Sequence, residues 1–247
     1  MTQVRSGIAY AGRSGSIDPS PTLGAGEVAR PGWLHELAER VSSTPPEWFS
    51  RFLPPDEGAR ESAVLILFGP PPKGATDEGE HVVLIERSHT MRTQPAQIAF
   101  PGGARDLEDD DLVATALREA EEEVGLDPSG VDVLAVLPSL FLSPANFVVA
   151  PVLGWWSAPS PIGVRDPAEV HDVLAVPVRH LIDPQHRFSV THPSGYVGAA
   201  FELGDLLLWG FTAGLLSSLL ELGGRSQPWD PALQRPLPDR YLGGRRG

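Results

Sequence analysis

The sequence predicts an α/β protein in which a mixed β-sheet carries helices on its faces. Short apolar segments with strand character recur between residues 62 and 203. Two longer segments, 112–124 and 205–222, have the length and apolar content of helices. Strands that alternate with so few helices favour a mixed sheet over a regular doubly wound array.

Composition narrows the class of protein. The chain has 247 residues and a hydrophobic fraction of 41%, which is enough to bury a core. The formal net charge of -13 argues against nucleic-acid binding through a broad basic surface. The absence of cysteine excludes disulfides, thiolate catalysis and zinc sites built on cysteine. Without a secretory segment or an apolar run long enough to span a bilayer, we expect a cytoplasmic protein with no membrane partner.

The elements are expected in a simple order along the chain. Residues 1–55 are expected to be an N-terminal extension, partly disordered, with a short helix at 31–41 that has proline at its start. The main domain should cover 56–224, and an irregular tail 225–247. Strands are expected at 62–69, 81–88, 131–142, 146–156, 188–192 and 199–203, with the first two paired across the loop 70–80. Residues 91–111 should be mainly loop, and 166–178 has mixed character.

The helix expected over 112–124 carries four glutamates within five residues. On a helical wheel of about 100° per residue, Glu119, Glu122 and Glu123 fall on one flank of the apolar face, whereas Glu121 points elsewhere. Like charges at these spacings repel, and no lysine follows four residues later to relieve them. Three converging carboxylates suit a hard divalent cation such as Mg²⁺ or Mn²⁺. The alternative is an ordinary solvated helix face.

The residues around this helix resemble the Nudix box, Gly-x5-Glu-x7-Arg-Glu-U-x-Glu-Glu-x-Gly-U, where U is a bulky aliphatic residue. The matching residues are Gly102, Gly103, Arg118, Glu119, Glu122, Glu123, Gly125 and Leu126. Ala120 stands where a larger residue is usual. One extra loop residue leaves Asp110 at the acidic position eight residues before Arg118. Nudix enzymes that resemble coenzyme A pyrophosphatases share both departures.

A second segment, upstream of the box, is similar to the same subgroup. Its pattern, Leu-Leu-x-x-Arg-Ser-x-x-Leu-Arg-x-His-x-Gly-x-Val-x-Phe-Pro-Gly-Gly, compares with LIERSHTMRTQPAQIAFPGG at 84–103. Gln94 replaces the histidine and Ala96 replaces the glycine. WGFTA at 209–213 also resembles a late helix of the subgroup. The resemblance covers residues 60–222.

The resemblance implies a Nudix α/β/α sandwich that hydrolyses a small nucleoside diphosphate derivative with the help of Mg²⁺ or Mn²⁺. It implies that Glu119, Glu122, Glu123 and the backbone carbonyl of Gly102 would hold the metal, and that Arg118 would orient the carboxylates. The implied substrate is coenzyme A or an acyl-CoA, cleaved to 3′,5′-ADP and 4′-phosphopantetheine or its acylated form. ADP-ribose, NADH or a nucleoside triphosphate stays open as substrate, as does a non-catalytic module that senses a nucleotide.

Further residues complete the expected site. Glu169 is the candidate for an additional metal ligand or the general base, with Asp166 as runner-up; an acid placed to favour a helix N-terminus is the alternative. Arg87 and Arg92 are candidates to bind substrate phosphates, because guanidinium groups bind phosphate through two bonds; ordinary surface charges are the alternative. The seven histidines show no metal-ligand spacing and are interpreted as structural or surface residues. Dimers are frequent in this superfamily, so the resemblance suggests a homodimer.

Overall fold

The strands of the protein lie mostly where the apolar segments predict them. The computed structural model describes residues 16–18, 28–49, 58–75, 79–91, 94–142 and 146–242. The strands in these ranges are β1 Ser16–Ile17, β2 Arg60–Gly69, β3 His81–Arg87, β4 Ile98–Ala99, β5 Gly102–Ala104, β6 Val131–Val136, β7 Leu140–Leu142, β8 Phe147–Trp156, β9 Ile162–Gly163, β10 Val170–Pro177, β11 Arg187–Thr191, β12 Val197–Leu203, β13 Leu206–Leu208 and β14 Gln234–Pro236.

The described strands form one large mixed sheet and two smaller sheets. The large sheet has the order β10-β3-β2-β8-β6, and β4, β5 and β7 pair with β3, β2 and β8 respectively. Its central pair, β2 and β8, is parallel, whereas β3 pairs antiparallel with both β2 and β10. The smaller sheets have the orders β13-β12-β11-β14 and β1-β9. The expected mixed sheet and the pairing of the first two long strands are therefore confirmed.

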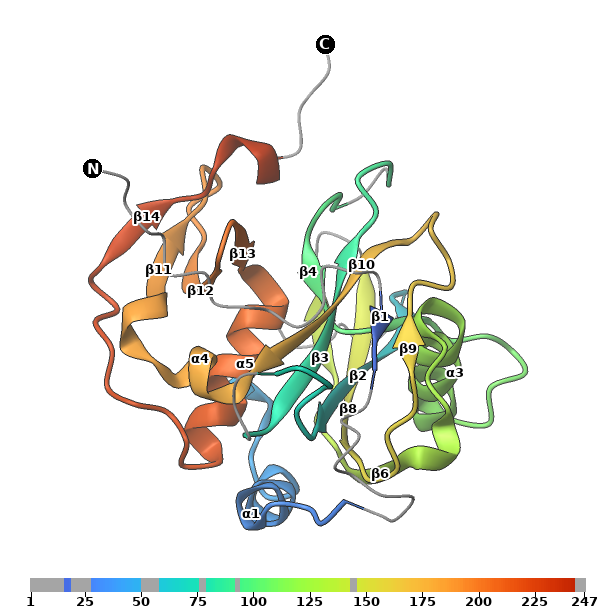
Figure 1. Ribbon diagram of the computed structural model, residues 1–247. Helices are drawn as coiled ribbons and strands as arrows, with labels where there is room; N and C mark the ends of the chain where they lie inside the picture. Colours follow the sequence, from blue (N-terminus) through green and yellow to red (C-terminus); the bar gives the residue numbers. More distant parts are fainter. Residues whose placement is uncertain are drawn as a thin grey trace.

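Helices cover both faces of the large sheet. The helical segments in the described ranges are α1 Gly32–Val41, α2 Pro46–Phe49, α3 Leu112–Val124, α4 Val178–Ile182, α5 Gly210–Leu222, and the 3-10 turns Pro128–Gly130, Pro184–His186 and Asp239–Tyr241. Figure 1 shows α3 on one side of the sheet and α1 and α5 on the other. This arrangement is the expected α/β/α sandwich. No described helix combines the length and the apolar composition that a membrane crossing requires.

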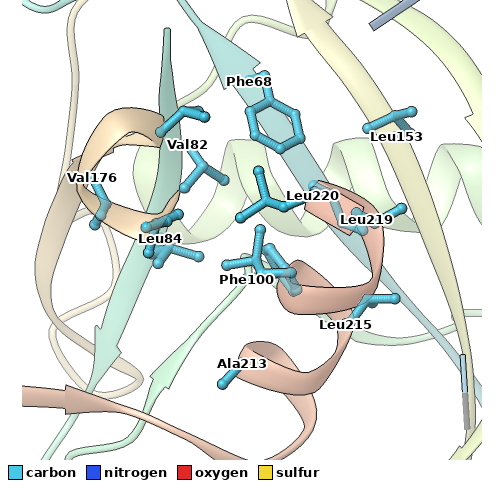
Figure 2. Packing of buried hydrophobic residues seen from close by; sticks show 14 of the residues in the cluster. Phe68, Val82, Leu84, Phe100, Leu153, Val176, Ala213, Leu215, Leu219 and Leu220 are labelled. Atoms are coloured by element: carbon cyan, nitrogen blue, oxygen red, sulfur yellow. The ribbon is translucent and has the colours of Figure 1, made fainter. Parts of the chain in front are cut away.

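The two faces of the sheet follow from the alternation of side chains along each strand. In β3, Val82 and Leu84 pack into the cluster that contains α1 and α5, whereas Val83 and Ile85 pack into the cluster that contains α3. Figure 2 shows the first cluster, in which leucines of α5 lie against side chains of β2, β3 and β8. The strands are apolar on both faces because both faces are covered.

The segment 205–222 was expected to be one long helix, and this prediction is wrong for its first residues. Leu206–Leu208 form β13, which pairs antiparallel with the end of β12. Gly204 lies in the turn between the two strands with a φ of 65°, and Gly210 begins α5 with a φ of 70°. Both conformations favour glycine, so two glycines separate a strand from a helix within one apolar run.

The segments that flank the expected main domain also pack on the sheet. Leu34, Leu37 and Val41 of α1 are buried in the same core as α5, because they recur at helical spacing on one face. The tail was expected to be irregular, but Gln234–Pro236 form β14, parallel to β11. The domain boundaries at 55 and 225 stay predictions, although described residues on both sides of them share contacts with the main domain.

A buried arginine holds the tail in place. The guanidinium group of Arg187 donates hydrogen bonds to the hydroxyl groups of Ser226 (2.9 Å) and Ser217 (2.7 Å). It also lies between the rings of Phe201 and Trp229, 5.0 and 4.7 Å from their centroids. Burial lowers the pKa of Arg187 to about 10. The aromatic faces and hydroxyl groups contact this cation directly, and the negative charge of Glu221 opposes the effect of burial on its pKa.

Candidate active site

The acidic helix α3 has the bounds that the sequence predicts, 112–124, and clear signals at both ends. The carboxylate of Asp111 accepts a hydrogen bond from the backbone N–H of Ala114 at the N-terminus. Gly125 closes the C-terminus with a left-handed φ of 71°. Because both ends are set by local residues, the angular positions of the glutamates on the helix are also set.

The glutamates of α3 divide as the helical wheel predicts. Glu123 is 2% exposed and Glu119 is partly buried, whereas Glu121 is exposed on another side of the helix. The side chain of Glu122 is 60% exposed, at the rim of the cluster. Three carboxylates therefore form a gradient from the protein interior to solvent along one flank of α3.

Glu123 is the most unusual acid of this group. Its Oε2 accepts a hydrogen bond of 3.0 Å from the backbone N–H of Gly102. Its Oε1 is buried and has no hydrogen-bond partner in the described structure. Burial, only partly offset by the Gly102 hydrogen bond, raises the pKa of Glu123 to about 8. A buried carboxylate oxygen without a partner is costly, so the site is suited to a cation that would bind it.

Burial also raises the pKa of Glu119, and the positive charge of Arg118 only partly opposes this effect. The carboxylate of Glu119 lies directly over Gly103, because a Cβ atom at that position would come within 2.5 Å of it. Gly102 is equally constrained, with a φ of 154° and only 2.3 Å between a hypothetical Cβ and the carbonyl oxygen of Ala63. The Gly-Gly pair of β5 therefore lets the strand approach the acids closely.

Arg118 connects the acids to one another. Its Nη1 donates to Glu119 (3.0 Å) and Glu122 (3.1 Å), and its Nη2 donates to the carbonyl oxygen of Ala104 (3.0 Å). Its Nε and Nη2 also bind the two carboxylate oxygens of Asp109, at 2.9 and 3.0 Å. One guanidinium group therefore binds Asp109, Glu119 and Glu122, and the role of Arg118 in orienting metal-binding carboxylates stays a prediction.

The acid that pairs with Arg118 is Asp109, the neighbour of Asp110, which stands eight residues before Arg118. Asp109 is buried and Asp110 is exposed. The hydrogen bond from Arg118 holds the pKa of Asp109 well below its usual range, and Thr115 and the backbone of Asp106 add further bonds. Spacing within the box does not identify the aspartate that Arg118 binds.

Of the candidate site residues outside the Nudix-like segment, Arg87 and Glu169 lie near the acids of α3, whereas the carboxylate of Asp166 binds its own turn. The positive charge of Arg87 lowers the pKa of Glu123 and the negative charge of Glu169 raises it, so both lie near the cluster. The backbone N–H of Ser88 donates to the carbonyl oxygen of Glu169 (2.7 Å), which joins the segments that carry these two residues. The carboxylate of Asp166 instead accepts from the backbone N–H of Ala168 (2.8 Å) within its own turn.

Arg92, the second candidate for a phosphate contact, lies outside the described residues. Its role and that of the Gly102 carbonyl stay predictions, because the contact seen at Gly102 is made by its N–H. One group of residues was missed by sequence reasoning: Glu86, His89 and His171 offer ligand atoms within 4.8 Å of one another. No spacing in the sequence indicates this group, since His171 of β10 is far in sequence from Glu86 of β3 and from His89 in the turn that follows β3.

The pKa of Glu123 leads to a prediction about stability. Without a divalent ion, the folded protein holds a proton up to about pH 8 that the unfolded chain loses near pH 4.5. Between pH 4.5 and 8 this group should therefore lower the free energy of unfolding as pH rises, by at most roughly 1.4 kcal/mol per pH unit. Denaturant unfolding in a chelator should show this slope, and Glu123→Gln should reduce it to the part that Glu119, whose pKa is also raised, contributes. Parallel curves for the two proteins would contradict the raised pKa.

A mixed sheet with a carboxylate-bearing helix on one face and a Gly-Gly strand beside the carboxylates defines the Nudix class of α/β protein. A family model described as the NUDIX domain matches residues 75–193. An uncharacterized Nudix hydrolase, NudL, of Photorhabdus laumondii is 32% identical over 170 residues, which cover 62% of this chain and 89% of that protein. The chain therefore belongs to the Nudix hydrolase family.

Other relatives are longer or more distant. The chain is 37% identical to Nudix hydrolase 22, chloroplastic, of Arabidopsis thaliana over 149 residues, which cover 57% of this chain and about half (49%) of that protein. A solved NUDIX hydrolase from Alicyclobacillus acidocaldarius aligns with 68% of this chain and 93% of its own, at 20% identity and a TM-score of 0.45. Nudix hydrolases generally use divalent metal ions, and the acids of α3 provide the oxygen ligands that such ions require.

Proposed function

We propose that the protein hydrolyses the diphosphate linkage of a small nucleoside diphosphate derivative in a reaction that depends on Mg²⁺ or Mn²⁺. The observation that carries this proposal is the set of three glutamates on one flank of α3, which Arg118 and the Gly-Gly strand hold together. A solvated acidic face has no use for a buried glutamate. Glu123, at 2% exposure, therefore favours a cation site over that alternative.

The donor set fits a hard divalent ion. Glu119, Glu122 and Glu123 supply carboxylate oxygens, and the partnerless Oε1 of Glu123 is a buried position for a cation. Such an ion, when bound, would neutralise diphosphate charge and acidify the attacking water. Arg118 keeps Glu119 and Glu122 in position through its Nη1. The carbonyl oxygen of Gly102 is a further candidate ligand.

Two residues beside the cluster have proposed roles of their own. Arg87 ends β3 next to Glu123, and its buried Nε has no hydrogen-bond partner in the described structure. A guanidinium group in this state is suited to a substrate phosphate. Glu169 is exposed beside the same acids, and we assign it as the general base or an additional ligand. Asp166 is the weaker candidate, because its carboxylate already binds its own turn. Arg92 stays a candidate for a second phosphate contact.

Coenzyme A or an acyl-CoA is the proposed substrate. The support is the resemblance of residues 84–103 to the segment of coenzyme A pyrophosphatases. Ala96, which replaces the glycine of that segment, has a φ of 59°. A left-handed backbone favours glycine, so the chain keeps a glycine-like conformation at this position despite the substitution. The backbone conformation at Ala96 is therefore one that the glycine of the subgroup's pattern would adopt without strain.

The substrate can be tested with the purified chain in Mg²⁺ or in Mn²⁺. Coenzyme A, dephospho-coenzyme A, ADP-ribose and NADH would be offered separately, and the products would be identified by mass spectrometry. We expect 3′,5′-ADP and 4′-phosphopantetheine from coenzyme A, with slower cleavage of substrates that lack the 3′-phosphate or the pantetheine arm. Glu122→Gln serves as the inactive reference.

Two other outcomes would redirect the proposal. Cleavage of ADP-ribose or NADH but not of coenzyme A would assign a changed specificity to the segment that contains Gln94 and Ala96. Binding of a nucleotide without turnover in either metal would favour a sensing module over an enzyme. A homodimer and a cytoplasmic location stay predictions, which sedimentation and cell fractionation would check.

A further inference from the structure

Two histidines and a glutamate gather at the end of β3, away from the acids of α3. The Nε2 of His89 lies 2.8 Å from Oε1 of Glu86, and the rings of His89 and His171 have centroids 4.3 Å apart. All three residues offer ligand atoms within 4.8 Å of one another. The side chain of Glu86 is only 8% exposed, whereas that of His89 is 55% exposed. A buried carboxylate is therefore accompanied by two accessible imidazoles.

An irregularity in the sheet lies at this group. The pairing of β10 with β3 shifts between Val170, opposite Arg87, and Asp172, opposite Glu86. His171 is the extra residue at this bulge, so both His171 and Asp172 lie against Glu86. A bulge changes the direction of a side chain, and bulges are frequent beside functional sites. In a regular pairing with the same start, His171 would be the residue opposite Glu86 and Asp172 would move one position along the strand.

This group and the acids of α3 lie on opposite faces of the sheet. Glu86 continues the row of Val82 and Leu84, which faces the core of α5. Arg87 continues the opposite row and acts on the pKa of Glu123. The two groups of ligands therefore do not share one metal.

We propose that Glu86, His89 and His171 bind a divalent transition-metal ion of the zinc class. Imidazole nitrogens suit such ions, and two histidines with one carboxylate form a known ligand set for zinc with an open fourth position. Metal–ligand bonds of about 2.1 Å place the ligand atoms of a tetrahedral site about 3.4 Å apart. Rotation of the exposed histidine side chains can close the present separations to that value.

The surroundings leave room for a fourth ligand. Glu86, His89 and His171 line a hollow of about 400 Å³ whose wall also includes Asp205, Arg240 and Tyr241. Water or a small anion can therefore reach an ion bound there. Mg²⁺ prefers oxygen ligands in octahedral geometry and should not compete for this site. The inference rests on these residues alone and does not depend on the proposed hydrolysis.

Equilibrium dialysis of the full chain against Zn²⁺ tests the site, with Mg²⁺ in large excess to occupy the oxygen ligands of α3. We expect one bound Zn²⁺ per chain. His89→Ala and His171→Ala should each weaken its binding by at least about 100-fold, since loss of a direct ligand exceeds the effect of losing a residue that only orients one. Co²⁺ provides a second readout, because its visible absorption reports nitrogen ligands and low coordination number. That absorption should appear in the wild type and disappear in both variants.

His35→Ala is the matched control. His35 also lies near a glutamate, with 3.5 Å between its Nε2 and Oε1 of Glu39, but among the described residues this exposed pair has no third ligand. The control should keep the bound Zn²⁺ and the Co²⁺ absorption. Glu86→Gln preserves shape while it removes the charge, and should weaken binding without unfolding the chain. Zn²⁺ binding that is absent in the wild type, or unchanged in the His89 and His171 variants, would overturn the proposal.

Discussion

Glu123→Gln should lower the rate of diphosphate hydrolysis by about three orders of magnitude, which corresponds to the loss of several kcal/mol of transition-state stabilisation from a metal site. The substitution is isosteric. An amide oxygen can still accept the hydrogen bond from the N–H of Gly102, so the fold should persist. What disappears is the negative charge at the buried end of the cluster.

The matched control is Glu121→Gln on the same helix. Glu121 is exposed and lies away from the cluster, so its variant should hydrolyse the substrate at the wild-type rate. Steady-state kinetics in Mg²⁺ and in Mn²⁺ would measure both variants, and circular dichroism would check their fold. Equal losses of activity in the two variants would mean that the total negative charge of α3, and not the buried carboxylate of Glu123, supports the reaction. Wild-type activity of Glu123→Gln would remove it from the metal site.

Arg118→Met should destabilise the protein by roughly 3–5 kcal/mol, the usual result of removing one partner of a buried ion pair. Asp109, whose side chain is 5% exposed, would lose both of its bonds to the guanidinium group. Glu119 and Glu122 would lose the group that holds them together. The rate of hydrolysis by the molecules that are still folded should therefore fall by about 10- to 100-fold.

Arg105→Met is the control for this prediction. Arg105 pairs with the carboxylate of Glu61 at 2.9 Å, with side chains 34% and 55% exposed. Its Nη2 also donates to the backbone carbonyl oxygens of Asp109 and Asp110, both at 3.3 Å, but not to the carboxylate of Asp109. Such a pair contributes at most about 1 kcal/mol. Adding Asp109→Asn to Arg118→Met should recover part of the lost stability, because no charge is then left buried without a partner. Urea unfolding would measure the wild type, Arg118→Met, Asp109→Asn and the double variant, with Arg105→Met beside them. Strictly additive effects would show that Arg118 and Asp109 do not act as a pair.

The sequence alone predicted an element correctly where residues at its two ends mark its first and last turns. Asp111 and Gly125 delimit α3, and the helical period then places Glu119, Glu122 and Glu123 on one flank. The strand expected over 62–69 is found as part of β2. A strand that is covered on both faces needs apolar residues at successive positions, so it is visible as an apolar run in the sequence. These features depend on residues that are close in sequence.

Prediction from the sequence failed where contacts between distant segments decide the outcome. The apolar run 205–222 could form either a strand or a helix, and pairing with β12 selected a strand for Leu206–Leu208. Asp109 and Asp110 are equally acidic in sequence, and only burial beneath Arg118 distinguishes them. The tail strand β14 likewise requires β11 as its partner.

The sequence by itself determined the class of fold, the acidic helix and the family to which the chain belongs, because these rest on local periodicity and on residues at fixed spacing. Only the tertiary structure decided which aspartate supports Arg118 and how deeply each glutamate is buried. It alone brought His171 of β10 to Glu86 of β3, because the two strands pair in the sheet. The physical reason is that burial and electrostatic environment depend on how distant segments pack together, which no spacing along one chain records.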